Sequence, residues 1–168
     1  MFSHTVAASR RIALAATTLL LLAACSDSKS SDITGVSGLE NFTASATGGV
    51  AGTFKGYSSQ SLAAGQFRLG LATLDTKFSL ALVRTGVRFP VGTYSVATLP
   101  STTTGVYASL SHNLTSAYVG TSGSVTVTAS SATSITGTFD INLLLAGGTT
   151  TTRVTGSFTS PCATGLSC

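Results

Sequence analysis

A period-two alternation of apolar and hydroxyl-bearing residues recurs from about residue 41 to residue 160, and it constrains this chain more than any other feature. Successive side chains of a β-strand point to opposite faces of a sheet, so this alternation is typical of strands with one buried and one solvated face. The segments are short and separated by turn residues, and none keeps a helical period for long. The sequence therefore predicts one all-β domain of about 8–10 short strands, either an antiparallel β-sandwich or a flattened barrel, because both folds alternate identically.

Composition agrees with this fold class. Serine and threonine make up roughly a third of the chain after residue 24, and only 8% of the chain is charged, against about a quarter in a typical soluble domain. Hydroxyl groups must therefore supply the solubility. Threonine and the β-branched and aromatic residues favour strands, and glycine favours turns. The few cations form no basic run, which argues against nucleic-acid binding.

We expect strands at residues 42–46, 50–57, 66–73, 77–84, 93–97, 105–111, 116–119, 124–129, 134–144 and 150–160. In the segment 124–129, the alternation predicts that Val125, Val127 and Ala129 face inward and that the residues between them face outward.

The last two expected strands allow a prediction of register. If Gly147 and Gly148 form a two-residue hairpin turn, residues whose numbers sum to 295 face each other. On the outer face this register pairs Asn142 with Arg153 and brings Asp140 diagonally within reach of the arginine. On the inner face each aromatic ring covers the glycine opposite. The inner pairs are Ile141–Val154, Phe139–Gly156 and Gly137–Phe158.

The first 24 residues have the layout of a secretion signal. Arg10 and Arg11 supply the positive charge, and residues 12–24 form an apolar run of roughly 13 residues, too short for the about 20 that a membrane-spanning helix needs. We therefore expect a signal helix that is removed. The run ends in Leu22-Ala23-Ala24-Cys25, which resembles the lipobox of bacterial lipoproteins.

That resemblance implies cleavage before Cys25, attachment of diacylglycerol to its thiol and acylation of the new amino group, for example with palmitate. Such an anchor binds membrane lipid stably. Because Ser26 follows the cysteine directly and Asp27 comes one position later, the family pattern favours the outer membrane over the inner membrane. Cleavage takes away two arginines, so the net charge of +4 becomes +2.

Four regions are therefore expected. They are a signal peptide at 1–24, the lipidated cysteine and a flexible polar tether at 25–40, the β-domain at 41–161 and a tail at 162–168. Within the tail, Cys162 and Cys168 are close enough in sequence to form a disulfide in the oxidising compartment of an exported protein.

Strand motifs in the domain are similar to those of an uncharacterised group of small β-rich bacterial lipoproteins. These motifs are Gly-Ser/Thr-Val-Thr-Val-Thr at 123–128, Ile/Val-x-Gly-Thr-Phe at 135–139, Val-Thr-x-Gly-Ser-Phe at 154–158 with one residue fewer here, and Gly-Thr-Tyr at 92–94. The resemblance implies a β-sandwich-like fold and no known activity.

No residue pattern points to catalysis. His112 is the only histidine after residue 24, no G-x-S-x-G elbow precedes a helix, and the acids do not form a paired-carboxylate spacing. The sequence also lacks clusters with metal-ligand spacing. We therefore predict that the protein is not an enzyme and has no catalytic residues, no cofactor and no metal site.

Arg84 is out of phase with its strand, because it follows Phe78, Leu80 and Leu82 on the same apolar face. Such a residue usually marks a strand end, where the charged head reaches water. The alternative is that Arg84, together with Arg88 or Arg68, lines the mouth of a cavity that admits an anionic ligand.

These observations predict a lipid-anchored, non-enzymatic protein of the bacterial cell envelope. We expect it to act as a structural, adhesive or protein-interaction module whose partner is an envelope protein or a glycan. The alternative is a carrier that holds a small apolar or glycan ligand inside the β-fold.

Overall fold

The structure, a computed structural model, describes residues 40–98 and 105–162. This part of the chain is all-β, as the sequence predicted, and contains nine strands. They are β1 (Phe42–Gly48), β2 (Gly52–Ala63), β3 (Gln66–Ala72), β4 (Phe78–Thr85), β5 (Gly92–Ala97), β6 (Val106–His112), β7 (Ser116–Ser130), β8 (Ser134–Leu145) and β9 (Thr151–Pro161). The described ranges hold no helix with the length and apolar character needed to cross a lipid bilayer. The expected signal helix and most of the tether lie outside them.

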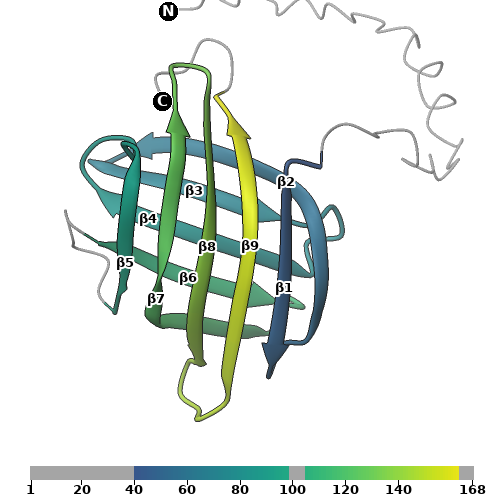
Figure 1. Cartoon of the computed structure of the whole chain (residues 1–168). Helices are drawn as coiled ribbons and strands as arrows, with labels where there is room; N and C mark the ends of the chain where they lie inside the picture. Colours follow the sequence, from purple (N-terminus) through teal and green to yellow (C-terminus); the bar gives the residue numbers. More distant parts are fainter. Residues whose placement is uncertain (1–39, 99–104, 163–168) are drawn as a thin grey trace, which may run out of the picture. The chain divides into compact units, whose positions relative to one another are not determined.

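The strands close into a ring in the order β1-β2-β3-β4-β6-β5-β7-β8-β9, and β9 pairs with β1 (Figure 1). Of the two predicted architectures, the structure has the barrel. The sheet is mixed, because β5 and β6 pair in parallel at Val96–Val106 and Ala97–Tyr107, whereas the other pairings are antiparallel as expected. Each described strand is paired on both sides, so the barrel is complete within residues 42–161.

The ring is flattened into two layers whose strands cross (Figure 1). The front layer consists of β5, the second half of β7, β8, β9 and β1. The back layer consists of the second half of β2, β3, β4, β6 and the first half of β7. Both β2 and β7 pass from one layer to the other: β2 pairs first with β1 and then with β3, and β7 pairs first with β6 and then with β5.

The corner in β7 corrects the prediction of two strands at 116–119 and 124–129. The register of β7 against β8 shifts between Gly120 and Ser122, and Gly123 has a φ of 111°. A side chain at Gly123 would collide with the carbonyl oxygen of Asp140. Only glycine therefore fits this bulge, which bends one continuous strand around the corner of the barrel instead of ending it.

A second register shift in β7 lies between Val127 and Ala129. Val125 and Val127 are buried, as predicted, but Ala129 is exposed. The inward orientation predicted for Ala129 is wrong because the extra residue of the bulge reverses the phase of the alternation.

The hairpin of β8 and β9 has the predicted register, including all three inner pairs. Its connection is longer than predicted. The backbone N–H of Leu145 donates to the carbonyl of Thr150 (2.8 Å), and that of Gly148 donates to the carbonyl of Leu145 (3.0 Å). The turn is therefore centred on Ala146 and Gly147, and the loop has four residues because Gly147, at φ 74°, supplies the left-handed position.

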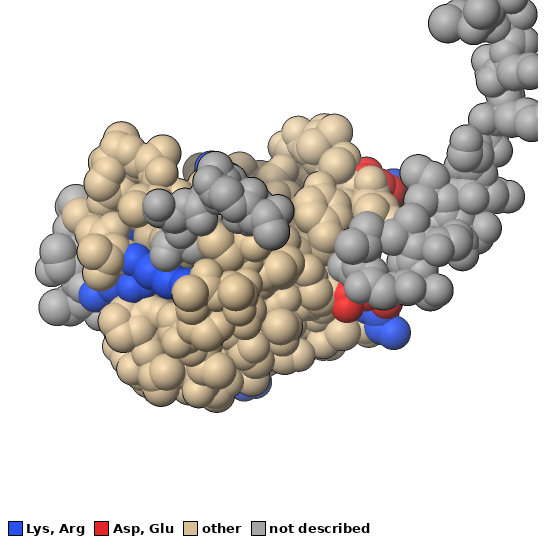
Figure 2. Space-filling model, turned by 90° about the horizontal axis from the view of Figure 1, so that it is seen from above, with Lys and Arg blue, Asp and Glu red and all other residues tan. Residues whose placement is uncertain are grey.

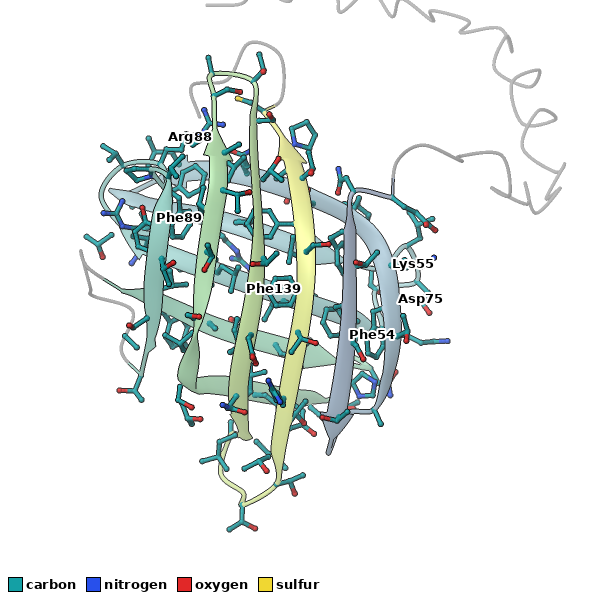
Figure 3. The ribbon with its side chains drawn as sticks, viewed as in Figure 1. Phe54, Lys55, Asp75, Arg88, Phe89 and Phe139 are labelled. Carbon is teal, nitrogen blue, oxygen red and sulfur yellow. The ribbon has the colours of Figure 1, made fainter. Side chains whose placement is uncertain are left out.

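Large side chains and glycines alternate across the inside of the front layer. Phe139 lies opposite Gly156, and in the next row Phe158 lies opposite Gly137. The two rings stack with centroids 6.5 Å apart, and Figure 3 shows Phe139 inside the barrel. Each ring occupies the space that the neighbouring glycine leaves, which allows the two layers to approach closely.

Apolar side chains fill the barrel from both layers. A side chain that lined a ligand-sized void would keep accessible surface, yet many inward residues have none. Those with 0% exposure include Phe67, Leu69, Leu71, Phe78, Leu80, Leu82, Ile135, Ile141, Leu143 and Val154. The interior around these residues is a packed core.

We predict that Gly156→Ala destabilises the barrel by about 1–3 kcal/mol, because the added Cβ would collide with the carbonyl oxygen of Thr43 and the ring of Phe139. Gly70→Ala is the matched control. It is also a strand glycine, but its Cβ would meet only the Ser59 hydroxyl, at 3.1 Å, on an exposed side chain that can rotate. Urea unfolding midpoints measure both effects, and equal losses would contradict the packing argument.

Candidate functional site

The outer face of the front layer carries aligned hydroxyl groups. The pairings of β5, β7, β8, β9 and β1 place one outward residue of each strand in a single line, and all five bear a hydroxyl. This hydroxyl row consists of Thr93, Thr126, Thr138, Ser157 and Thr43. Neighbouring strands lie about 4.8 Å apart, so the hydroxyls repeat at about that spacing across five strands.

Hydrogen bonds between side chains order the two ends of the hydroxyl row. The hydroxyl oxygens of Thr93 and Thr126 are 3.1 Å apart, and those of Thr43 and Ser157 are 3.3 Å apart. Thr138, at the centre, is exposed. The row therefore presents ordered groups that both donate and accept hydrogen bonds.

Two open hollows flank the hydroxyl row. The first has a volume of about 450 Å³ and is lined by Thr43, Thr138 and Ser157 of the row and by further residues of β1, β7, β8 and β9. The second has a volume of about 280 Å³, and its lining residues are Gly123, Ser124, Asp140, Asn142 and Arg153. The hydroxyl row therefore forms part of the lining of the first hollow, and the second hollow lies on neighbouring residues of β7, β8 and β9.

Arg153 and Asp140 form an ion pair in the second hollow, and their charges cancel. The Nε of Arg153 donates to Oδ1 of Asp140 (2.9 Å), and its Nη2 donates to Oδ2 (2.7 Å), which is the contact predicted from the sequence. These hydrogen bonds hold the pKa of Asp140 below its ordinary 3.8 and raise the pKa of Arg153. The pair as a whole carries no net charge.

Arg84 lies at one end of the barrel, on the inward face of β4, and its neighbours are aromatic. Phe89 is buried in the barrel end, and the Cζ of Arg84 lies 6.0 Å from the centroid of the Phe89 ring and 5.2 Å from that of Tyr94. Its Nη1 donates to the carbonyl of Val87 (3.2 Å). Arg84 therefore packs beneath the segment 86–91, which caps this end, and its cation is stabilised by ring faces and a carbonyl dipole.

Arg88 lies at the same end of the barrel as Phe89 (Figure 3). Its backbone carbonyl accepts a 3.5 Å hydrogen bond from Nη1 of Arg84. Figure 2 looks onto this end and shows Lys or Arg atoms gathered in a hollow between uncharged lobes. The structure thus brings Arg84 and Arg88 together. That they line the mouth of a cavity for an anionic ligand stays a prediction.

Arg68 does not join them. It faces outward from β3, whereas Phe67, its neighbour in the chain, pairs with Arg84 on the inward side. Arg68 lines an outer hollow of about 370 Å³ with Tyr57, Ser59 and other residues of β2, β3 and β4. The strand period separates the two arginines onto opposite faces.

His112 ends β6, and its ring meets the edge of the Phe54 ring at a centroid distance of 6.3 Å. Its polar contact is with the Asn113 amide, at 3.4 Å.

Asp75 is held by a hydrogen bond from the Thr73 hydroxyl, which lowers its pKa, and by Lys77. Within the described ranges, no three His, Cys, Asp or Glu side chains gather in a metal-binding group.

Cys162 takes part in a disulfide, and its backbone N–H donates to the carbonyl of Thr133 (2.7 Å). The start of the tail is therefore fixed to the loop between β7 and β8. Cys25 and Cys168 lie outside the described residues, so lipidation and the Cys162–Cys168 pairing stay predictions.

Comparisons of the chain with protein-family models, curated proteins and solved structures find no match. The resemblance to bacterial lipoproteins therefore rests on the sequence motifs.

Sequence reasoning missed the hydroxyl row. The alternate threonines of 124–128, 136–138 and 155–159 were a visible signal. The line across five strands also depends on the pairing of β9 with β1 and of β5 with β7, which join segments far apart in the chain.

We predict that Arg153→Gln raises the pKa of Asp140 back toward 3.8, because the hydrogen bonds that favour its ionised form are lost. A lowered folded-state pKa stabilises the fold at pH values above 3.8, and this contribution disappears as the pH falls through the folded-state pKa. An NMR titration of the side-chain carboxyl carbons measures the shift. Asp75, held by Thr73 and Lys77, is the internal control, and an unchanged Asp140 would contradict the prediction.

Proposed function

We propose that this protein is a lipid-anchored, non-enzymatic binding module of the bacterial cell envelope that holds a neutral glycan across the hydroxyl row. The observation that carries the proposal is the alignment of five hydroxyl-bearing residues on five neighbouring strands. It refines the adhesive or interaction role predicted from the sequence.

The packed interior favours an outer binding surface over an internal one. Phe139 and Phe158 stack across the inside of the front layer, and the inward apolar residues of β3 and of β4 up to Leu82 have no accessible surface. A carrier would have to displace these side chains to admit a ligand, with a loss of buried apolar area. Contacts from outside need no such rearrangement.

The chemistry of the hydroxyl row suits an uncharged polymer of sugars. Each threonine supplies a donor, an acceptor and a methyl group, which match the hydroxyls and the C–H faces of a sugar ring. The strand spacing of about 4.8 Å is close to the length of one sugar in an extended β-linked chain, so successive sugars can meet successive strands. Because Asp140 and Arg153 neutralise each other, the face favours a neutral polymer over a charged one.

The anchor and the tether support a role at a surface. A lipidated Cys25 would hold the module on the membrane, and the polar residues between Cys25 and Glu40 would let it reach envelope polymers.

We predict that the chain from Ser26, which lacks the signal peptide and Cys25, co-sediments with amorphous cellulose, a neutral β-linked probe, and that Thr138→Lys lowers the bound fraction severalfold. The change puts a long cation at the centre of the hydroxyl row. Ser59→Lys is the matched control, because it makes the same kind of change on an exposed outward position of the back layer. Equal binding by the two variants, or no binding by the unmodified chain, would contradict the glycan proposal.

We also predict that Cys25→Ser releases the protein from the membrane fraction when the full chain is expressed in a Gram-negative host. Serine has no thiol to carry the diacylglycerol, so the anchor cannot form. The measurement is membrane fractionation together with the intact mass, which for the unmodified chain should include the added lipid. Cys162→Ser keeps Cys25 and should remain in the membrane fraction; loss of both variants from it would argue against lipidation at Cys25.

A further inference from the structure

We propose that Arg88 binds a phosphate-type oxyanion through the Nε–Nη2 edge of its guanidinium, at the capped end of the barrel. This site is separate from the hydroxyl row and does not rest on the glycan proposal. Its starting observation is that Nε and Nη2 of Arg88 are both buried and have no hydrogen-bond partner.

Arg153 shows which ligand the Nε–Nη2 edge of an arginine can bind. Arg153 uses its Nε and Nη2 to hold the two oxygens of Asp140, at 2.9 and 2.7 Å. These two N–H groups point the same way, so they match two oxygens of a carboxylate or a phosphate at once. In Arg88 the same two groups, which form its fork, are buried and have no oxygen partner.

Without a bound anion, the two buried Arg88 donors, Nε and Nη2, are energetically unfavourable. A buried donor without a partner loses its hydrogen bonds to water and gains none in return, and the loss is larger when the group is charged. Arg88 as a whole is only partly buried, so rotation of its outer side-chain torsions can turn the edge toward solvent. Binding of an oxyanion would satisfy both donors.

The surroundings of Arg88 carry positive charge. Arg84 donates from Nη1 to the backbone carbonyl of Arg88, at 3.5 Å, which places a second cation at this end of the barrel. Neither the Asp75–Lys77 ion pair nor the Asp140–Arg153 ion pair involves Arg88. No carboxylate of the described residues therefore competes with an external anion for the Arg88 fork.

Apolar residues beside Arg88 suit a phosphate that belongs to a lipid. Val87 and Val91, on either side of the buried Phe89, are 68% and 63% exposed. At a bilayer surface these side chains could enter the headgroup region while the guanidinium held the phosphate. Free phosphate offers the same oxygens without the apolar contact, so the experiment separates the two sources.

The experiment uses the chain from Ser26, which contains all nine strands of the barrel but not Cys25. It follows the arginine Nε–H signals by ¹⁵N NMR during a titration with inorganic phosphate. We expect a saturable shift of the Arg88 signal and no shift of the Arg68 signal. Arg88→Gln should weaken binding about tenfold or more, since hydrogen bonds to a charged group are lost. The matched control is Arg68→Gln, which removes the same charge from the outward face of β3.

Arg88→Lys tests the geometry, because lysine keeps the charge but not the fork. Weaker phosphate binding by Arg88→Lys supports the proposal, and unchanged binding overturns it. Thermal unfolding of each variant shows whether the fold is retained.

Vesicles identify the source of the phosphate. The unmodified chain, Arg88→Gln and Arg68→Gln are each sedimented with vesicles of phosphatidylcholine alone and of phosphatidylcholine with phosphatidylglycerol. Binding that is lost only in Arg88→Gln indicates a lipid headgroup, and a phosphate-dependent NMR shift without vesicle binding indicates free phosphate. The absence of both signals in the unmodified chain overturns the proposal while leaving cellulose binding untouched.

Discussion

The pairing of β1 with β9 is the constraint on which the rest of the structure depends. It joins Phe42 to Phe158 and Ala46 to Val154, residues from opposite ends of the domain. Without it, both strands would be open edges whose unpaired backbone groups could pair with another chain. The closed ring also brings the inward rows of β1, β8 and β9 into contact, so that the small side chains of β1 lie beside the rings of the C-terminal hairpin. Closure and core packing therefore depend on each other.

Closure of the barrel also determines which surfaces other molecules can reach. Because Phe139 and the inward residues of the back layer fill the barrel, the chemistry that the fold presents lies on its outside and at its ends. In a chain with few charges, most outward positions of the front layer are occupied by threonine and serine, and antiparallel pairing places them in line. A composition that supplies solubility thus becomes an ordered pattern of hydrogen-bonding groups once the ring has formed.

How much could be predicted from the sequence depended on how local the determining contacts were. The β8–β9 register was predictable, because Ile141 and Val154 are close in the chain and one register satisfied both faces. The continuity of β7 was not, because Gly123 marks a turn and a bulge equally well and only the pairing with Asp140 decides between them. The hydroxyl row needed pairings between distant strands, which no local pattern specifies.

The arginines show how similar sequence contexts acquire different chemistry. Arg153 finds Asp140 on the adjacent strand, and its charge is neutralised locally. Arg84, inward at the end of β4, is stabilised by the ring faces of Phe89 and Tyr94 and by a backbone carbonyl. Burial of Phe89 fixes the backbone of the cap, and this in turn sets the position of the adjacent Arg88, whose fork has no partner. The packing that closes this end of the barrel therefore also places the two buried Arg88 donors for which we propose an external anion.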